Sequence, residues 1–313
     1  MRLFVTGACG QLGHDVVNEA ASRGYETIAS DITPEYRGAD DGSFAVSAPY
    51  LPLDITDETA VQNHITESHP DVIIHCGAWT AVDAAEDEEN RPKVFAVNAG
   101  GTRNIARAAK SIGAKMVYLS TDYVFNGEGT RPWEADDQCC DPLNIYGQSK
   151  LEGELAVREL TDRYFIVRTS WVFGLSSNNF VKTMLRVGKN HSQVRVVSDQ
   201  IGTPTYTPDL ARILLDMAET EKYGIYHVTN SEAEKNAFIS WFDFTKEIYK
   251  QAGLDTEVIP VTTSEYGLSK ARRPFNSRMD KQKLIREGFA PLPDWKDALH
   301  RYLTVIGETK QLQ

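Results

Sequence analysis

Hydrophobic and polar positions follow the order expected of an α/β protein through the first half of the chain. Short apolar runs that end in small or polar residues alternate there with longer amphipathic segments. Near-continuous apolar runs predict strands buried in a parallel sheet, and a 3.6-residue period predicts the helices that cover it. The predicted strands are 2–6, 25–31, 71–76 and 114–121, with a further strand and loop over 163–174, and the predicted helices are 15–24, 95–113 and 146–160.

The pattern becomes less regular after residue 170. Residues 178–189 and 208–219 have the period of amphipathic helices, 224–230 reads as a short strand, and the stretch 238–307 mixes both patterns. We therefore predict an α/β fold, with a doubly wound, Rossmann-like parallel sheet and a smaller, mixed α/β lobe. The main domain should cover residues 1–170, with returns to its sheet near 206–230, and residues 171–313 should form most of the interleaved lobe.

Composition narrows the class of protein. The 313 residues carry a formal net charge of −11 without a basic run, which argues against a nucleic-acid partner. No apolar run reaches the length of a membrane span and Met1 leads directly into a predicted strand, so we expect a cytoplasmic protein without a membrane partner. The cysteines lack the spacing of metal ligands, so we predict reduced thiols and no metal. They are Cys9, Cys76, Cys139 and Cys140.

Three glycines follow the first predicted strand in the pattern T-G-x-x-G-x-x-G. Glycine allows a tight turn there, close approach of the backbone to a pyrophosphate, and close packing of helix on strand. Residues 1–170 are therefore predicted to bind a dinucleotide, although a glycine-rich turn without a ligand is the alternative. The glycines are Gly7, Gly10 and Gly13, and the candidate cofactor contacts in this turn are Gly7, Cys9, Gly10, Gln11 and Leu12.

Acidic residues after the second predicted strand bear on the choice of cofactor. Asp31 ends that strand, where a carboxylate usually accepts hydrogen bonds from the adenosine ribose and repels a 2′-phosphate. This favours NADH, but Arg37 lies close enough in sequence to leave NADPH open. Asp54, followed by Ile55, is placed to approach the adenine. Asp57 can cap the next helix, and for each of these aspartates a turn or capping role is as good an explanation as ligand contact.

The strand that begins at residue 71 ends in small residues, at the edge where open α/β sheets bind their ligands. The candidate cofactor contacts here are Cys76, Gly77 and Ala78, with Thr80 on the following loop. A buried Asn98 in the helix 95–113 could tie that helix to the site. The acidic run 86–89 is most simply a solvated helix start that suits the helix dipole.

The chemistry is expected between residues 120 and 150. Tyr146 and Lys150 are four residues apart on a predicted helix, so both side chains lie on one face. An ammonium one turn away should favour the phenolate and lower the pKa of the tyrosine toward neutral pH. Thr121, at the end of an apolar strand, can hold a substrate oxygen beside the phenol. Thr, Tyr and Lys in this order form the proton-handling set of a short-chain dehydrogenase/reductase, whereas a Y-x-x-x-K pair alone is more often a surface tyrosine beside a lysine.

Motifs along nearly the whole chain add a more specific resemblance. They are TGACGQLG, TAVDAAE, STDYVFNG, PLNIYGQSKLEGE, RTSWVFG, NNFVKTML, DQIGTPT and RRPFNSRMD. Through them the sequence closely resembles dTDP-4-dehydrorhamnose reductases, which belong to the extended short-chain dehydrogenase/reductase superfamily. The resemblance implies reduction of the C4 keto group of dTDP-4-dehydro-β-L-rhamnose to dTDP-β-L-rhamnose, the last step of dTDP-L-rhamnose synthesis. It implies NADH or NADPH as the cofactor, and a homodimer is a further expectation.

The same resemblance implies roles for individual residues. Tyr146 gives the new hydroxyl its proton, Lys150 tunes Tyr146 and contacts the nicotinamide ribose, and Thr121 hydrogen-bonds the carbonyl. The implied substrate contacts are Val82, Asp122 and Tyr123 around the sugar, Trp171 beside the thymine, and Asn179 and Arg273 at the phosphates. Core packing is the alternative for Trp171, and a surface ion pair is the alternative for Arg273.

Three rival functions remain at the level of sequence. The first is a reductase or epimerase that acts on another nucleotide-sugar with the same fold and proton relay. The second is a non-catalytic subunit resembling the regulatory β subunit of methionine adenosyltransferase, against which the motifs TAVDAAE and RTSWVFG argue. The third, a redox sensor that uses Cys9 near a helix N-terminus, has no other support in the sequence.

Overall fold

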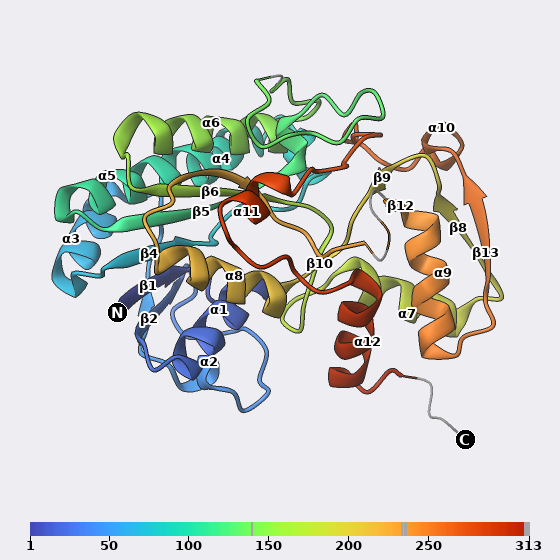
Figure 1. The fold of residues 1–313 in the computed structure, drawn as a ribbon, viewed down its shortest axis with the longest axis horizontal. Helices are drawn as coiled ribbons and strands as arrows, with labels where there is room; N and C mark the ends of the chain where they lie inside the picture. Colours follow the sequence, from blue (N-terminus) through green and yellow to red (C-terminus); the bar gives the residue numbers. More distant parts are fainter. Residues whose placement is uncertain (139, 233, 235–236, 310–313) are drawn as a thin grey trace.

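The computed structural model describes residues 1–138, 140–232, 234 and 237–309. Within these residues a parallel sheet of seven strands runs in the order β11-β6-β5-β4-β1-β2-β3. The doubly wound, Rossmann-like fold predicted from the sequence is thereby confirmed (Figure 1). The strands are β1 (Arg2–Thr6), β2 (Glu26–Asp31), β3 (Tyr50–Pro52), β4 (Val72–His75), β5 (Lys115–Thr121), β6 (Tyr164–Thr169) and β11 (Gly224–His227).

Alternating side chains of each strand enter two different hydrophobic layers, because successive residues of a strand point to opposite faces. Leu3 and Val5 pack in the layer under α1 (Gln11–Ser22) and α8 (Thr207–Ala218). Phe4, between them, packs in the layer under α3 (Glu58–Ser68), α5 (Thr102–Ile112) and α6 (Ile145–Leu160). Figure 1 shows the two groups of helices on opposite sides of the sheet.

The smaller lobe has its own aromatic core. It is built from α7 (Phe180–Asn190), α9 (Trp241–Ala252) and α12 (Trp295–Val305), together with β8 (Gln193–Val197), which pairs in parallel with β13 (Glu257–Val261). Two further small sheets have two strands each: β7 (Val172–Phe173) pairs with β10 (Thr205–Tyr206), and β9 (Ile201–Gly202) pairs with β12 (Ile239–Ser240). Two returns to the main domain, α8 and β11, lie in the chain between α7 and α9.

The structure adds detail that the simple sequence pattern does not contain. The predicted helix 95–113 is α4 (Arg91–Phe95), a π-helical turn (Ala96–Gly101) and α5 in succession. The segment 32–50, whose path had no prediction, contains α2 (Phe44–Ser47) and packs on α1, where the Tyr36 hydroxyl lies 2.5 Å from His14 Nδ1. The chain also forms two short helices, α10 (Thr263–Tyr266) and α11 (Gln282–Arg286).

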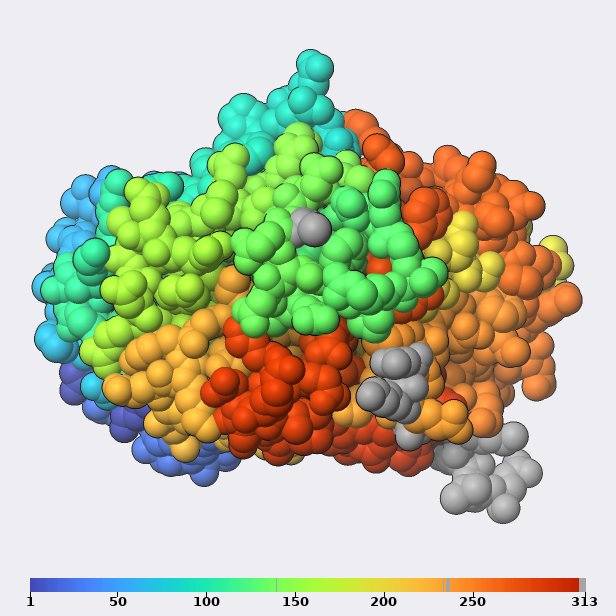
Figure 2. Space-filling view, turned by 45° about the horizontal axis from the view of Figure 1, so that its top comes forward, coloured from blue at the N-terminus to red at the C-terminus, as the bar shows by residue number. Residues whose placement is uncertain are grey.

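The loop after β5 packs against the C-terminal third of the chain. A bridge between Trp133 and Met279 joins the two segments, and Figure 2 shows the green loop as a raised surface beside the orange and red C-terminal residues. Cys9 and Cys76 are free thiols, and Cys139 lies outside the described residues. No helix among the described residues is long and apolar enough to cross a membrane.

Candidate active site

The glycine turn after β1 is shaped by close backbone contacts. Gly7 has φ +69°, and a Cβ at this position would lie 2.6 Å from the backbone nitrogen of Gly77. A Cβ at Gly13 would overlap the Gly7 carbonyl, which explains why α1 can pack so closely on the turn. Gly10 precedes α1 without a side-chain cap, so the first N–H groups of this helix are open to an anion. The turn therefore fits a dinucleotide pyrophosphate.

Asp31 links the end of β2 to the glycine turn. Its carboxylate accepts hydrogen bonds from the backbone N–H of Cys9 at 2.9 Å and of Ile32 at 2.8 Å. The backbone of Arg37 also lies at the glycine turn, because its N–H donates to Cys9 Sγ at 3.2 Å. The Arg37 side chain is exposed and paired with Glu35. The Asp31 carboxylate and the Arg37 backbone thus lie together at the turn, and this arrangement excludes neither NADH nor NADPH.

The two aspartates after β3 have the local roles that were the alternative to ligand contact. Asp57 caps α3 by accepting the N–H of Ala60 at 3.0 Å, so the capping prediction is confirmed. Asp54 is exposed and accepts both the N–H and the hydroxyl of Thr56, at 2.9 and 2.8 Å. Ile55 packs against Gly101 of the π-helical turn. Contact of Asp54 and Ile55 with a cofactor stays a prediction.

A buried histidine at the end of β4 connects three parts of the cofactor edge. The Thr102 hydroxyl donates to Asn98 O, so it accepts from His75 Nε2 at 3.1 Å. The Thr6 hydroxyl accepts from Gly77 N–H at 3.2 Å and donates to His75 Nδ1 at 2.7 Å. Burial, with a smaller effect of Lys150, lowers the pKa of His75 to about 3, so the ring is neutral. No motif in the sequence singled out His75.

Asn98 ties the π-helical turn to both neighbouring segments, as the sequence suggested. It is fully buried, accepts the Trp79 N–H at 2.8 Å, and donates to the Ser149 hydroxyl at 2.9 Å. Asn98 therefore connects this helix to the loop after β4 and to α6, and its contact with a cofactor stays a prediction. Cys76, Gly77 and Ala78 are half-buried beside it, and Thr80 is exposed.

The start of α6 is fixed by groups from three segments. The Asn144 side chain accepts the Gly147 N–H at 2.8 Å, and Glu86 accepts the Ile145 N–H at 2.8 Å. A Cβ at Gly147 would overlap the Tyr123 carbonyl, so glycine allows α6 to approach the end of β5. The interpretation of Glu86 as part of a solvated run was wrong, because its carboxylate caps this helix.

Thr121 and Tyr146 lie together at the carboxyl end of β5. Burial raises the pKa of Tyr146 above its ordinary value, the negative charge of Asp122 adds to this rise, and the nearby Thr121 hydroxyl opposes it. The direction is the reverse of the expected lowering, because burial and the Asp122 charge both favour the neutral phenol. The tyrosine is consequently a phenol at neutral pH, as a proton donor should be.

Lys150 lies one turn further along α6 and is buried. Its Nζ lies 4.2 Å from the centre of the Tyr118 ring, a cation–π contact. Burial lowers the pKa of Lys150 to about 7, against the attraction of Glu154. The lysine is therefore near the midpoint of its titration at neutral pH.

Asp122 and Tyr123 follow Thr121 on a short 3-10 turn. The Thr121 hydroxyl donates to Asp122 Oδ1 at 3.0 Å, whereas Asp122 Oδ2 is buried without a hydrogen-bond partner among the described residues. Burial raises the pKa of Asp122 to about 6, against hydrogen bonds from Ser277 and Thr121. The Tyr123 ring meets the Tyr146 ring edge-on at 5.7 Å.

The other predicted substrate residues come from the lobe and its connections. Trp171 has φ +51° and stacks on Trp241 with ring centres 3.7 Å apart, so one face of its ring is covered. Asn179 caps α7, and its amide donates to Gln11 and Tyr302, both at 3.0 Å. The side chain of Asn179 is thus engaged within the protein, and its contact with phosphate stays a prediction.

Arg273 belongs to a contact that joins two motifs far apart in sequence. Its Nη2 lies 2.5 Å from Asp83 Oδ2, and its Nη1 donates to the Tyr123 hydroxyl at 3.2 Å. The arginine is therefore part of a half-buried ion pair and also contacts Tyr123, whose ring packs against that of Tyr146. Val82 is half-buried next to Asp83. The sequence interpretation assigned no role to Asp83. The motif D-A-A-E places Asp83 and Glu86 three residues apart, so that both side chains lie on one side of a helical turn, and this spacing was the available signal.

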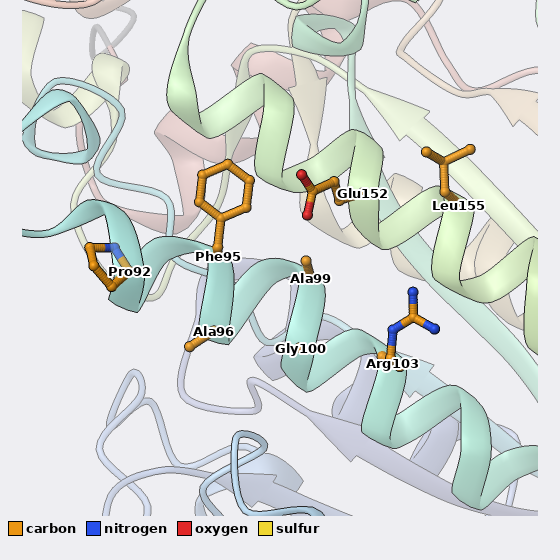
Figure 3. Close-up of a pocket in the computed structure, with 8 residues that line it drawn as sticks. All are labelled: Pro92, Phe95, Ala96, Ala99, Gly100, Arg103, Glu152 and Leu155. Carbon is orange, nitrogen blue, oxygen red and sulfur yellow. The ribbon is translucent and has the colours of Figure 1, made fainter. Parts of the chain in front are cut away.

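A separate groove of about 560 Å³ lies on the outer helices, away from these residues. Figure 3 shows Phe95 and Ala99 on one wall and Glu152 and Leu155 of α6 on the other. Among the described residues, no group of three or more His, Cys, Asp or Glu side chains is placed to hold a metal ion.

Comparisons with known proteins agree with this arrangement. The family model described as RmlD substrate binding domain matches residues 1–307. A curated dTDP-4-dehydrorhamnose reductase from Aggregatibacter actinomycetemcomitans is 38% identical, covering 95% of this chain and 97% of its own length. The spore coat polysaccharide biosynthesis protein SpsK of Bacillus subtilis is also 38% identical, covering 96% of both chains.

Solved structures extend the similarity. A dTDP-4-dehydrorhamnose reductase from Bacillus anthracis in complex with NADP superposes with a TM-score of 0.86 at 40% identity, covering 97% of this chain and 99% of that one. A relative from Clostridium acetobutylicum has a TM-score of 0.87 at 38% identity, covering 98% and 100%. The chain therefore belongs to the RmlD substrate-binding-domain family, and its relatives include proteins named dTDP-4-dehydrorhamnose reductase.

Proposed function

We propose that this protein is an NAD(P)H-dependent reductase that converts dTDP-4-dehydro-β-L-rhamnose to dTDP-β-L-rhamnose. The observation that carries the proposal is the meeting of Thr121 and Tyr146 at the carboxyl end of β5, with Lys150 one helical turn away. This edge of the sheet is also the one at which the glycine turn presents open N–H groups. The family match over residues 1–307 extends the support to the substrate lobe.

The chain's own residues supply the proton and the geometry for this reaction. A bound nicotinamide supplies a hydride to the C4 carbon of the sugar. Tyr146, whose pKa is raised by burial, is protonated at neutral pH and donates its proton to the oxygen that gains negative charge. Thr121 holds that oxygen beside the phenol by a hydrogen bond. Lys150 orients the nicotinamide ribose and stabilises the tyrosinate that remains.

The cofactor is assigned to the turn and the strand ends around it. Backbone N–H groups at the start of α1 would hold the pyrophosphate, and Asp31 would hold the adenosine ribose. Either NADH or NADPH fits, because Asp31 favours the first and the neighbouring Arg37 can accommodate the second. The further proposed contacts are Gly7, Cys9, Gly10, Gln11, Leu12, Asp54, Ile55, Cys76, Gly77, Ala78, Thr80 and Asn98.

The nucleotide-sugar is assigned to the region where the carboxyl ends of the sheet strands face the lobe. Asp122 offers a buried, unpartnered oxygen to the sugar, and Val82 and Tyr123 flank it. Trp171, half-buried beside Trp241, is proposed to meet the thymine, and Arg273 the phosphates. Asn179, which holds Gln11 of the glycine turn, is proposed to act near the phosphates mainly by keeping the lobe against that turn.

The domain division and assembly follow the same reasoning. Residues 1–170, with the returns near 206–230, are proposed to bind the dinucleotide, and the rest of 171–313 to bind the substrate. We also propose a cytoplasmic homodimer, for which the groove on the outer helices offers a surface of mixed polarity that includes Leu155, 51% exposed. A shift to a single monomer by sedimentation in the Leu155→Glu variant would support this face, and an unchanged dimer would exclude it.

The decisive test follows NAD(P)H oxidation with enzymatically generated dTDP-4-dehydrorhamnose. Turnover that depends on the protein and yields dTDP-rhamnose is the expected result, and the same assay with EDTA checks for a metal requirement. Faster turnover of another nucleotide-keto-sugar would favour the rival reductase or epimerase. Binding of nucleotides without turnover of any keto-sugar would favour a regulatory subunit instead.

A further inference from the structure

One carboxylate holds a lobe segment against the main domain. We use the name strap for residues 268–273, which follow α10 and run back toward the sheet (Figure 1). Asp83 Oδ1 accepts the N–H of Lys270 at 3.1 Å and of Ala271 at 3.0 Å, and its Oδ2 binds the Arg273 guanidinium. Both oxygens of Asp83 are therefore committed to the strap.

The strap reaches the catalytic tyrosine through Arg273. The Nη1 of Arg273 donates to the Tyr123 hydroxyl at 3.2 Å, and the Tyr123 ring contacts the Tyr146 ring edge-on. Because one guanidinium bridges Asp83 and Tyr123, the position of the strap fixes the position of a side chain beside the phenol. A charge-assisted hydrogen bond from a planar guanidinium suits this purpose, since it sets direction as well as distance.

The proposed site is too buried for a substrate to enter unless a segment such as the strap moves. Thr121, Asp122 and Lys150 are 7%, 2% and 3% exposed, so a hexose needs an opening to reach them. The strap begins after Gly267, which has φ +62°, and continues with Leu268, 80% exposed. A glycine in the left-handed region next to an exposed stretch is a suitable hinge, and the contacts at Asp83 are half-exposed and so can exchange with water.

We propose that Asp83 is a positioning residue that latches the strap closed over the sugar pocket and holds Arg273 against Tyr123. The role of the latch in turnover rests on the proposed reductase function, but the latch itself does not. Asp83 touches neither Tyr146 nor the proposed cofactor site. Its removal should therefore weaken substrate binding more than it slows the chemical step.

Amide hydrogen exchange tests the latch without any substrate. In the Asp83→Ala variant the amides of residues 270 and 271 should exchange at least about 10-fold faster than in the wild type, because both lose their acceptor. The matched control is Asp87→Ala, which removes an exposed ion pair to the side chain of Lys270 but leaves both amide acceptors in place. Its amides should exchange within about 2-fold of wild type. Equal exchange in Asp83→Ala and wild type would overturn the proposal.

Kinetics separate positioning from a merely structural role. Asp83→Ala should raise the KM for the nucleotide-sugar about 10-fold or more, change kcat less, and leave the Kd of NAD(P)H unchanged. Asp83→Asn keeps one acceptor oxygen and should recover part of the affinity. A fall in kcat with an unchanged KM would contradict a positioning role. If the wild type does not turn the keto-sugar over, the proposed function fails, and the exchange experiment still decides the latch.

A second variant protects the test if Asp83→Ala folds poorly. Arg273→Lys keeps the charge but cannot bridge Asp83 and Tyr123, so it should loosen residues 270 and 271 less than Asp83→Ala does. It should still raise the KM for the nucleotide-sugar. Exchange and KM both at wild-type values in Arg273→Lys would also overturn the proposal.

Discussion

Glu154 and Arg168 form a buried, two-point ion pair beside the end of β5. Arg168 Nη2 lies 2.6 Å from Glu154 Oε2 and Nε lies 2.8 Å from Oε1, and both side chains are at most 2% exposed. Ser120, which precedes Thr121, donates its hydroxyl to Glu154 Oε1 at 2.5 Å. The pair therefore holds α6, β6 and the end of β5 in one arrangement.

Breaking this pair on one side should be strongly destabilising. Glu154→Gln leaves the Arg168 charge buried without its counter-charge, so we expect the free energy of unfolding to fall by about 3 kcal/mol or more. The double variant Glu154→Gln/Arg168→Met removes the orphaned charge and should recover much of that loss. Urea unfolding followed by circular dichroism measures both. A double variant no more stable than the single one would contradict this explanation.

Tyr146→Phe should separate binding from chemistry. The change removes only the phenol hydroxyl, so the Kd of NAD(P)H should stay nearly unchanged while kcat falls by about 100-fold or more. Stopped-flow oxidation of NAD(P)H and fluorescence titration of the cofactor give the two quantities. Near-normal kcat would refute Tyr146 as the proton donor.

Asp31→Ala should shift the choice of cofactor toward NADPH. The carboxylate no longer repels a 2′-phosphate, so the ratio of kcat/KM for NADPH to that for NADH should rise. Because Asp31 also holds the Cys9 N–H, both cofactors should bind more weakly than in the wild type. Asp57→Ala, which removes only a helix cap, is the matched control. An unmoved ratio would mean that Asp31 does not select the cofactor.

The affinity for NAD(P)H should fall as pH rises through about 7. The pKa of Lys150 is lowered to about 7, so the ammonium is present below that pH and is lost above it. An ammonium donates stronger hydrogen bonds to ribose hydroxyls than an amine does, so the Kd should increase on the alkaline side. Fluorescence titration between pH 6 and 9 measures this, on the order of a few-fold. Lys150→Met should bind more weakly with a flat profile, and an equally sloped profile there would assign the effect to another group.

The sequence predicted the scaffold well because its signals are local. Buried strands, the glycine turn and the Asp57 cap each depend on a few neighbouring residues, and each is found where it was predicted. The same holds for Asn98, whose position in a helix beside the site suggested a tie between segments. Family membership followed from motifs spread over nearly the whole chain and is confirmed over residues 1–307.

What the sequence missed depends on contacts between distant segments. Asp83 and Arg273 are 190 residues apart, and nothing in either neighbourhood indicates the other. The pKa of Tyr146 was expected to fall because Lys150 is one turn away, but burial, which spacing cannot measure, raises it. Glu86 looked like one member of an acidic run, and only the fold shows it at the start of α6.

The position of β11 at the edge of the main sheet affects how the chain folds during its synthesis. β6 acquires its outer neighbour only from residues 224–227, and the layer over α1 is completed only by α8. A nascent chain that has emerged only as far as residue 170 thus has an open strand edge and an uncovered apolar layer, both of which invite aggregation. The half that we propose to bind the cofactor is synthesised before α8 and β11 but completes its sheet and its apolar layer only with them.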